Sequence, residues 1–132
     1  MFNKLTPNMM VEDVERTIAF YTQTLGFEVL ATNPETQPFE WAMVGSGGVT
    51  LMFQSRPSFS QEFPPLAGAP VAASLSFYTE VTGIDALYER LRERVEIVKE
   101  LHDSFYGTRE FAFRDCNGYV LALSEQAGQS EQ

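Results

Sequence analysis

The stretch LTPNMMVEDVERTIAFYTQTLGF, residues 5–27, decides the fold. Residues 5–11 lean apolar and are typical of a strand. Asp13 is a good helix N-cap residue, and Gly26 stands where a helix commonly ends. Apolar side chains recur between them at helical spacing: Val14, Ile18, Tyr21 and Leu25. The stretch therefore predicts a strand followed by an amphipathic helix of about three turns.

Beyond this helix, the first half of the sequence predicts three more strands and then a loop. Glycine, proline and asparagine separate three short runs that read as strands: residues 27–31, 39–44 and 49–54. Residues 55–70 hold four prolines, and we expect them to form a connecting loop. The first half is thus ordered strand, helix, strand, strand, strand.

The second half repeats this order. Val81 and Ile84 stand 70 residues after Val11 and Val14 (81 − 11 and 84 − 14), which indicates an internal repeat. Thr82 is expected to cap a helix with one apolar stripe: Ile84, Leu87, Tyr88, Leu91 and Val95. The expected strands are residues 73–81, 96–101, 108–114 and 119–124, with a turn at 115–118. In each half one helix would cover one face of a sheet, which leaves the other face free to line a cavity.

Length and composition predict one cytoplasmic domain, residues 1–132. Its expected parts are a first module at 4–54, a linker loop at 55–70, a second module at 71–125 and a polar tail at 126–132. No apolar run approaches about 20 residues, so no membrane span is expected. The N-terminus lacks the pattern of a secretory signal. Cys116 is the single cysteine, which fits a reducing compartment.

The net charge of −9 narrows the expected partners. An acidic protein repels phosphate backbones, so no nucleic-acid partner is expected. The same field attracts cationic small molecules. Keeping the protein soluble is the simpler role of this charge.

Two segments of the chain carry a resemblance to a family. Residues 5–14 with Thr17-Ile-Ala-Phe-Tyr21 and Leu25-Gly-Phe27 resemble the opening of vicinal-oxygen-chelate (VOC) proteins, which include glyoxalase I, extradiol dioxygenases and bleomycin-resistance proteins. Residues 113–123 resemble their final hairpin, with Cys116 where proline is usual. The resemblance implies an α+β fold, in which two βαβββ modules form a partial barrel (the glyoxalase/bleomycin-resistance/dihydroxybiphenyl-dioxygenase-like fold). It also implies a homodimer.

The resemblance places four metal-ligand positions on the first and last strands of the two modules. In this chain they fall on Thr6, Leu51, Ser76 and Ala122. Divalent metals of this class bind imidazole nitrogen or carboxylate oxygen, which none of these side chains supplies. His102 is the only histidine. We therefore expect no metal and no cofactor, and neither standard glyoxalase nor extradiol dioxygenase activity.

Strand alternation and aromatic content indicate which residues line a pocket. Ser76, Tyr78 and Ala122 share the small, polar parity of their strands, and aromatic side chains bind flat or cationic ligands. Arg109 and Glu110 are adjacent on a strand, so one of them faces inward. The pocket candidates are Thr6, Asn8, Trp41, Leu51, Phe53, Ser76, Tyr78, Phe105, Tyr106, Arg109 and Ala122.

Three functions follow from these patterns. The first is a metal-free small-molecule binding protein of the bleomycin-resistance type, which sequesters an aromatic or cationic compound without breaking a bond. The second is a lyase, isomerase or dioxygenase-like enzyme with a non-standard site, using His102, Glu110 or Tyr106 as acid or base, or a metal at His102 and Asp103. The third is an accessory domain with a vestigial cavity. Convergence of the acid–base side chains in a structure would favour the second.

Overall fold

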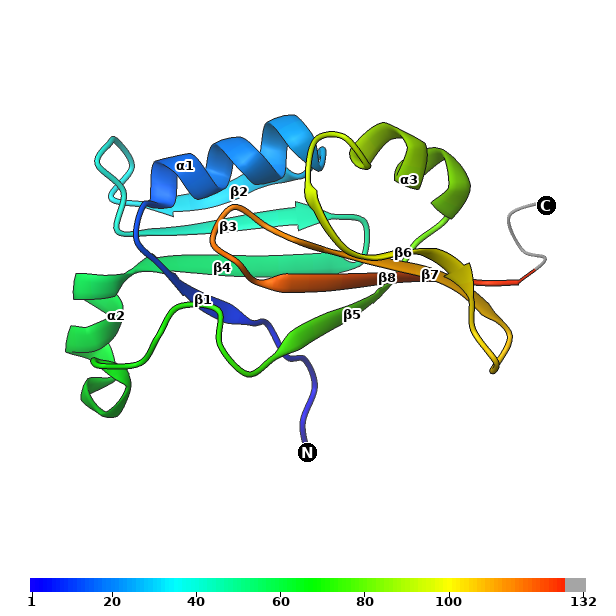
Figure 1. The fold of residues 1–132 in the computed structure, drawn as a ribbon. Coiled ribbons are helices and arrows are strands. Elements are labelled where there is room, and N and C mark those ends of the chain that lie inside the picture. Colours follow the sequence, from blue (N-terminus) through cyan, green and yellow to red (C-terminus); the bar gives the residue numbers. More distant parts are fainter. Residues whose placement is uncertain (128–132) are drawn as a thin grey trace. The chain divides into compact units, whose positions relative to one another are not determined.

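The structure, a computed structural model, describes residues 1–127. The rest of the expected tail, residues 128–132, lies outside the described residues. Two compact units divide the chain, Met1–Ala72 and one that begins at Ala73. Each unit holds one four-stranded sheet (Figure 1). Among residues 1–127, no helix is long and apolar enough to cross a membrane.

The first unit follows the predicted order, with one additional helix. Its elements are β1 (Asn8–Val11), α1 (Val14–Ala19), β2 (Glu28–Asn33), β3 (Trp41–Ser46), β4 (Val49–Ser55) and α2 (Arg56–Glu62). The sheet order is β1-β4-β3-β2, in which β1 runs parallel to β4 and the other pairs are antiparallel. Helix α1 packs against β3 and β4, so one face of this sheet is covered by α1.

Both predicted ends of the first helix are confirmed. The Asp13 side chain accepts a hydrogen bond from the backbone N–H of Arg16 at 3.0 Å, as an N-cap residue does. Beyond α1 the helix widens into a π-helical turn, Phe20–Thr24. Gly26 then adopts φ 82°, a conformation that costs glycine little and other residues more.

The linker is more ordered than the sequence predicts, since residues 55–70 contain α2 and a short 3₁₀ turn, Pro64–Leu66. Pro57 stands in the first turn of α2, where its missing N–H leaves no helical bond unmade. Phe59 is buried, and its ring centroid lies 5.4 Å from that of Phe63. Burial of Phe59 therefore stabilises a helix that the proline content of the segment did not predict.

The second unit repeats the plan. Its elements are β5 (Ser76–Glu80), α3 (Ile84–Leu91), β6 (Glu96–Asp103), β7 (Thr108–Arg114) and β8 (Val120–Gln126). The sheet order is β5-β8-β7-β6, with β5 parallel to β8 and the other pairs antiparallel. Helix α3 packs against β7 and β8. Gln126, assigned to the tail by the sequence, belongs to β8.

Strand β5 is shorter than the predicted strand over residues 73–81. Ala72 and Ser74 have φ values of 67° and 72°, in the left-handed region that a strand excludes. The strand therefore begins only at Ser76.

The cap of α3 differs from the predicted Thr82. The N-cap residue is Gly83, with φ 76° and no capping side chain of its own. The carboxylate of Glu125 on β8 accepts instead, from the backbone N–H groups of Gly83 and Ile84, both at 3.0 Å. Glu125 is only 5% exposed, so a buried anion satisfies the N-terminal donors of this helix.

Candidate functional site

The sheet of the second unit has two chemically different faces. Phe111 packs against Tyr88 of α3, with ring centroids 5.0 Å apart, and its β8 partner is Leu123. The adjacent residues Glu110 and Ser124 form the next register pair and so project to the other face. His102 pairs with Glu110 on that same face. The face opposite α3 is therefore polar.

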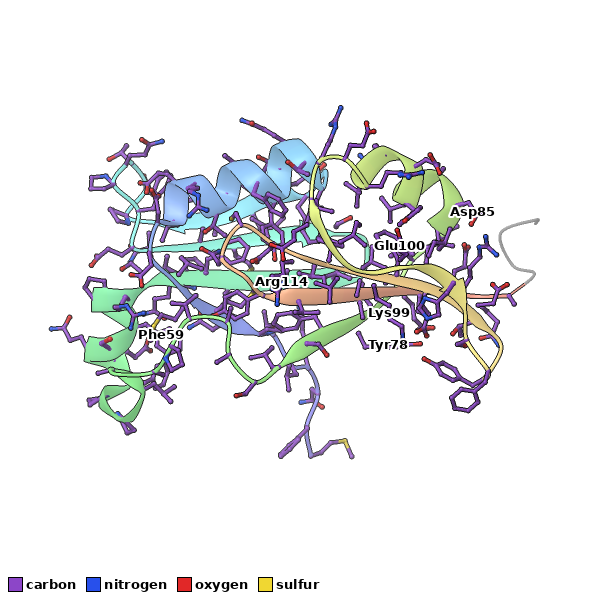
Figure 2. All side chains as sticks on the ribbon, in the orientation of Figure 1. Phe59, Tyr78, Asp85, Lys99, Glu100 and Arg114 are labelled. Carbon is purple, nitrogen blue, oxygen red and sulfur yellow. The ribbon has the colours of Figure 1, made fainter. Side chains whose placement is uncertain are left out.

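Tyr78 lies on this face of β5. It is 58% exposed and projects away from α3, which carries Asp85 (Figure 2). Its register partner is Ala122. Tyr78 and Ala122 are thus pocket candidates that the structure does place on the face opposite α3.

Three hydroxyl groups converge on one oxygen of Glu110. Oε2 accepts from Tyr106 at 2.7 Å, from Thr108 at 2.7 Å and from Tyr78 at 2.9 Å. The Tyr78 hydroxyl also lies 2.9 Å from the hydroxyl of Ser124. Having one hydrogen, Tyr78 donates to Glu110 when it accepts from Ser124. We call these five residues the Glu110 cluster.

Further hydrogen bonds, between Ser104 and Thr108, fix the loop between β6 and β7. The hydroxyl of Ser104 accepts from the backbone N–H of Thr108 at 3.0 Å. The hydroxyls of Ser104 and Thr108 are 2.7 Å apart. Because Thr108 gives its hydrogen to Glu110, Ser104 donates to Thr108. The hydrogen bonds therefore run in one direction, from Ser104 to Thr108 and from Thr108 to the carboxylate of Glu110.

These contacts change the acidity of the groups involved. Burial raises the pKa of Glu110, but the hydrogen bonds from Thr108, Tyr106 and Tyr78 outweigh it and hold the pKa below the ordinary value of 4.5. The hydrogen bond to Glu110 raises the pKa of Tyr106. Glu110 is therefore ionised at neutral pH, and the tyrosine keeps its proton.

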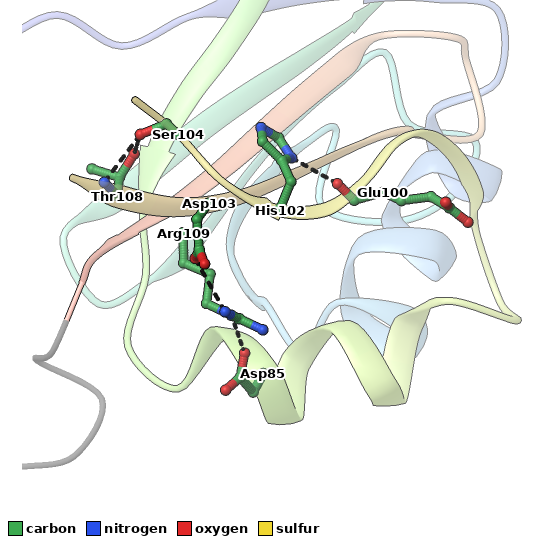
Figure 3. Close-up of polar contacts among 7 residues, drawn as sticks. All are labelled: Asp85, Glu100, His102, Asp103, Ser104, Thr108 and Arg109. Carbon is green, nitrogen blue, oxygen red and sulfur yellow. Dashed lines mark hydrogen bonds and ion pairs between the residues drawn. The ribbon is translucent and has the colours of Figure 1, made fainter. Parts of the chain in front are cut away.

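His102 presents one nitrogen for chemistry. Its Nδ1 lies 2.7 Å from the backbone carbonyl oxygen of Glu100 (Figure 3). A carbonyl can only accept, so Nδ1 carries the hydrogen, and the neutral ring has its lone pair on Nε2. His102 is half-buried, not fully in solvent.

Asp103 and Arg109 face the other way, which corrects two expectations. Arg109 donates to Asp85 of α3 at 2.7 Å and to Asp103 at 3.1 Å, on the opposite side of β6 from His102 (Figure 3). The hydrogen bond to Asp85 raises the pKa of Arg109. Arg109 thus ties the hairpin to α3 and does not join the Glu110 cluster. His102 and Asp103 cannot share a ligand, because adjacent strand residues point apart.

The loop between β6 and β7 carries exposed aromatic rings. Phe105 is 98% exposed and Tyr106 54%, and their ring centroids are 5.0 Å apart. Of these two residues, only Tyr106 is hydrogen-bonded to Glu110 in the described part of the chain. Phe111, the next aromatic residue along β7, is 1% exposed and belongs to the core.

In the first unit, the face opposite α1 combines amides with apolar side chains. Asn8 donates to Oε1 of Gln54 at 2.7 Å. Trp41 pairs with Gln54 in register, and Met43 and Asn8 both pair with Met52. Among the described residues, Oδ1 of Asn8 is a buried acceptor with no partner. Asn8 and Trp41 therefore lie on the face on which they were predicted.

Three residues of the first unit depart from their predicted positions. Phe53 is fully buried, with its ring centroid 4.8 Å from that of Tyr21 below α1. Leu51 has the same parity and is 5% exposed, so both belong to the core. Met52 takes the place on the opposite face. Thr6 precedes β1 and is not part of the strand.

With Met52 in place of Leu51, the positions that the resemblance implies are Thr6 and Met52 in the first unit, and Ser76 and Ala122 in the second. These side chains do not fit a divalent metal, because they offer no imidazole or carboxylate donor. Within residues 1–127, no three His, Cys, Asp or Glu side chains are grouped so that they could hold a metal ion. The metal-dependent chemistry of the VOC group therefore has no matching donor set in the described part of the chain.

Glu110 was named from the sequence only as a possible acid or base, and it was not among the pocket candidates. Alternation showed that Arg109 and Glu110 face opposite sides, but not which side each faces. The missing signal lies in the alternation of Leu121 and Leu123 with Ala122, which is typical of a strand whose leucines face the core. Pairing Leu123 with Phe111 fixes the inward side of β7 and turns Glu110 to the other face.

Comparison with known proteins supports this assignment of the fold. The family model described as the Glyoxalase/Bleomycin resistance protein/Dioxygenase superfamily matches residues 5–123. No curated protein matches the chain.

Solved structures resemble the chain over nearly its whole length. A superfamily member from Sphaerobacter thermophilus DSM 20745 is 22% identical with a TM-score of 0.78, covering 96% of this chain and 98% of its own. TnmS3, an antibiotic binding protein from Streptomyces sp. CB03234, is 24% identical with a TM-score of 0.74, covering 96% and 98%. TioX from Micromonospora sp. ML1 is 19% identical with a TM-score of 0.74, covering 95% and 99%. With a family model that spans most of its length and the two-unit fold, the chain belongs to the Glyoxalase/Bleomycin resistance protein/Dioxygenase superfamily.

Proposed function

We propose that the protein is a metal-free small-molecule binding protein that sequesters an aromatic or cationic compound, as a homodimer in the cytoplasm. The observation that carries the proposal is the chemistry of the implied ligand positions of each unit, which offer small or apolar groups in place of metal donors: Thr6 and Met52 in the first unit, Ser76 and Ala122 in the second. A site built without metal donors binds its ligand through shape, aromatic contact and hydrogen bonds.

The first unit, taken by itself, offers an apolar surface that suits such a ligand. Trp41 supplies a large flat ring, and Met43 and Met52 are flexible, polarisable side chains that adapt to varied ligand shapes. Asn8 and Gln54 add amide groups beside them. TnmS3, which shares the fold, is described as an antibiotic binding protein, and we propose a related role here.

Thermal unfolding of chelator-treated protein tests the proposal. Planar aromatic and cationic antibiotics are added in one series, and nickel, zinc, manganese or iron(II) in another. A ligand at about 100 times its Kd adds about 2.7 kcal/mol, which raises Tm by about 6–10 °C. We expect such a shift from an antibiotic, its loss in Trp41→Ala, and its retention in Phe2→Ala, which removes an exposed aromatic ring outside β1. A shift from metals alone would contradict the proposal, and no shift at all would favour a vestigial cavity.

An acid–base enzyme is the second candidate, favoured by one observation. Nε2 of His102 has a free lone pair in the neutral ring, and His102 pairs with Glu110 on the same face. Glu110 itself is a poor base at neutral pH, because its pKa is lowered. If the protein is such an enzyme, α-hydroxycarbonyl compounds should take up deuterium from D₂O at the carbon next to the carbonyl. The uptake is measured by NMR, and we expect His102→Ala to abolish it. No uptake above background by the wild type would reject this candidate function.

A further inference from the structure

We propose that the Glu110 carboxylate, flanked by the rings of Tyr78 and Tyr106, binds a cationic nitrogen group of the ligand, such as a protonated amine or an amidinium. This inference rests on the proposed function, because it assumes that a small organic molecule binds. It names the chemistry of one group that such a ligand would carry, at a place within the second unit. Three observations support it.

The first observation is a fixed negative charge that takes part in no ion pair within the described residues. In the described part of the chain, no lysine or arginine forms an ion pair with Glu110. Its neighbour Arg109 is held by Asp85 and Asp103 on the other side of the sheet. Three hydroxyl donors fix the carboxylate in place, so a cation meets an anion that is already oriented.

The second observation is the aromatic surface beside this charge. Tyr78 is 58% exposed and Tyr106 54%, yet both hydroxyls point to Glu110. Each phenol is held at its polar end, which leaves the ring accessible. Ring faces attract ammonium and guanidinium groups, so carboxylate and rings favour the same kind of ligand group.

The third observation is a hydrogen-bond acceptor next to Glu110 on the same face of the sheet, the side chain of His102. His102 and Glu110 are register partners, a relation that places Cβ atoms about 5 Å apart. The hydrogen on Nδ1 leaves Nε2 as an acceptor. A nitrogen cation that carries several N–H donors can use both groups.

A role as general base fits these contacts less well. Proton abstraction is most efficient when the pKa of the base lies near the working pH. The hydrogen bonds to Glu110 lower its pKa and so move it away from neutral pH. Binding a cation, by contrast, benefits from a carboxylate that stays ionised.

Binding of a matched pair of probes tests the inference. Benzamidine is a cation and benzamide is its neutral analogue, and both can be titrated into ¹⁵N-labelled protein by NMR. We expect benzamidine to bind more tightly and Glu110→Gln to weaken it by about tenfold or more, with benzamide unchanged. Glu93→Gln removes the same charge from the exposed turn after α3, and we expect it to affect neither probe.

The outcomes separate the two proposals. If both probes bind and Glu110→Gln weakens neither, the cation subsite is overturned and the binding function stands. If neither probe nor any antibiotic binds, both proposals fail. Should Glu110→Gln not fold, the wild type still decides: added salt must weaken benzamidine binding and spare benzamide. Equal effects of salt on the two probes would overturn the subsite.

Discussion

Glu110 also makes stability depend on pH. Its folded-state pKa lies below the ordinary 4.5, so the folded protein favours the ionised form more than the unfolded chain does. This contribution is fully present above about pH 5, and it is lost as pH falls through the lowered pKa. We expect Glu110→Gln to unfold at lower urea than wild type at pH 7, with the difference shrinking toward pH 3. A constant difference across this range would show that the charge of Glu110 does not matter.

Glu125 is a residue whose removal should be more damaging. Glu125→Ala leaves the N–H groups of Gly83 and Ile84 without their acceptor, next to a buried helix end. We expect a loss of about 1–3 kcal/mol in the free energy of unfolding, measured by urea denaturation. Glu89→Ala, on the exposed side of α3, should change it by less than about 0.5 kcal/mol. Equal effects of the two substitutions would refute the capping role.

The sequence did not show which of two adjacent strand residues faces the helix, and this is what its analysis missed at the scale of residues. Leu51 and Met52 are both apolar, so composition does not say which one faces away from α1. A shift of one residue exchanges the two faces of a strand. The same ambiguity applied to Arg109 and Glu110; the pairing of Phe111 with Leu123 resolves it in the folded protein, and the ion pair of Arg109 with Asp85 agrees.

At the scale of elements, the β6–β7 loop should be sensitive at Gly107. This residue has φ 92° and open space around an added Cβ, so Gly107→Ala is strained by backbone conformation alone. We expect a loss of about 1 kcal/mol in stability and weaker benzamidine binding, because Tyr106 is displaced. Gly48→Ala is the control, since Gly48 has equal space without a positive φ. No difference between the two variants in urea denaturation would contradict this prediction.

The elements differ in how readily the sequence reveals them. Helix α1 was predictable because an N-cap, an apolar stripe and a terminal glycine agree. Helix α2 was not, since its seven residues give too short a stripe and include a proline. The late start of β5 was hidden as well, because Ala72 and Ser74 are not residue types that indicate a positive φ.

At the scale of the whole molecule, the internal repeat predicts the architecture, whereas the candidate site depends on a few individual side chains. An offset of 70 residues between matching positions predicts two similar modules, and each unit does have the strand order first-last-third-second. Many functions share one fold, so the repeat cannot name a ligand. The chemistry depends instead on a few side chains on faces that the repeat leaves free.

Strand β8 carries one member of the Glu110 cluster, Ser124, next to the residue that caps α3, Glu125. Ser124 contacts Tyr78 on one face, and Glu125 holds Gly83 and Ile84 on the other. Solvent can exchange the amide hydrogens at these two helix positions only when the carboxylate of Glu125 moves away. Deuterium exchange at Gly83 and Ile84 is therefore a built-in reporter of events on the opposite side of the sheet, and a ligand that stiffens β8 would slow it without touching α3.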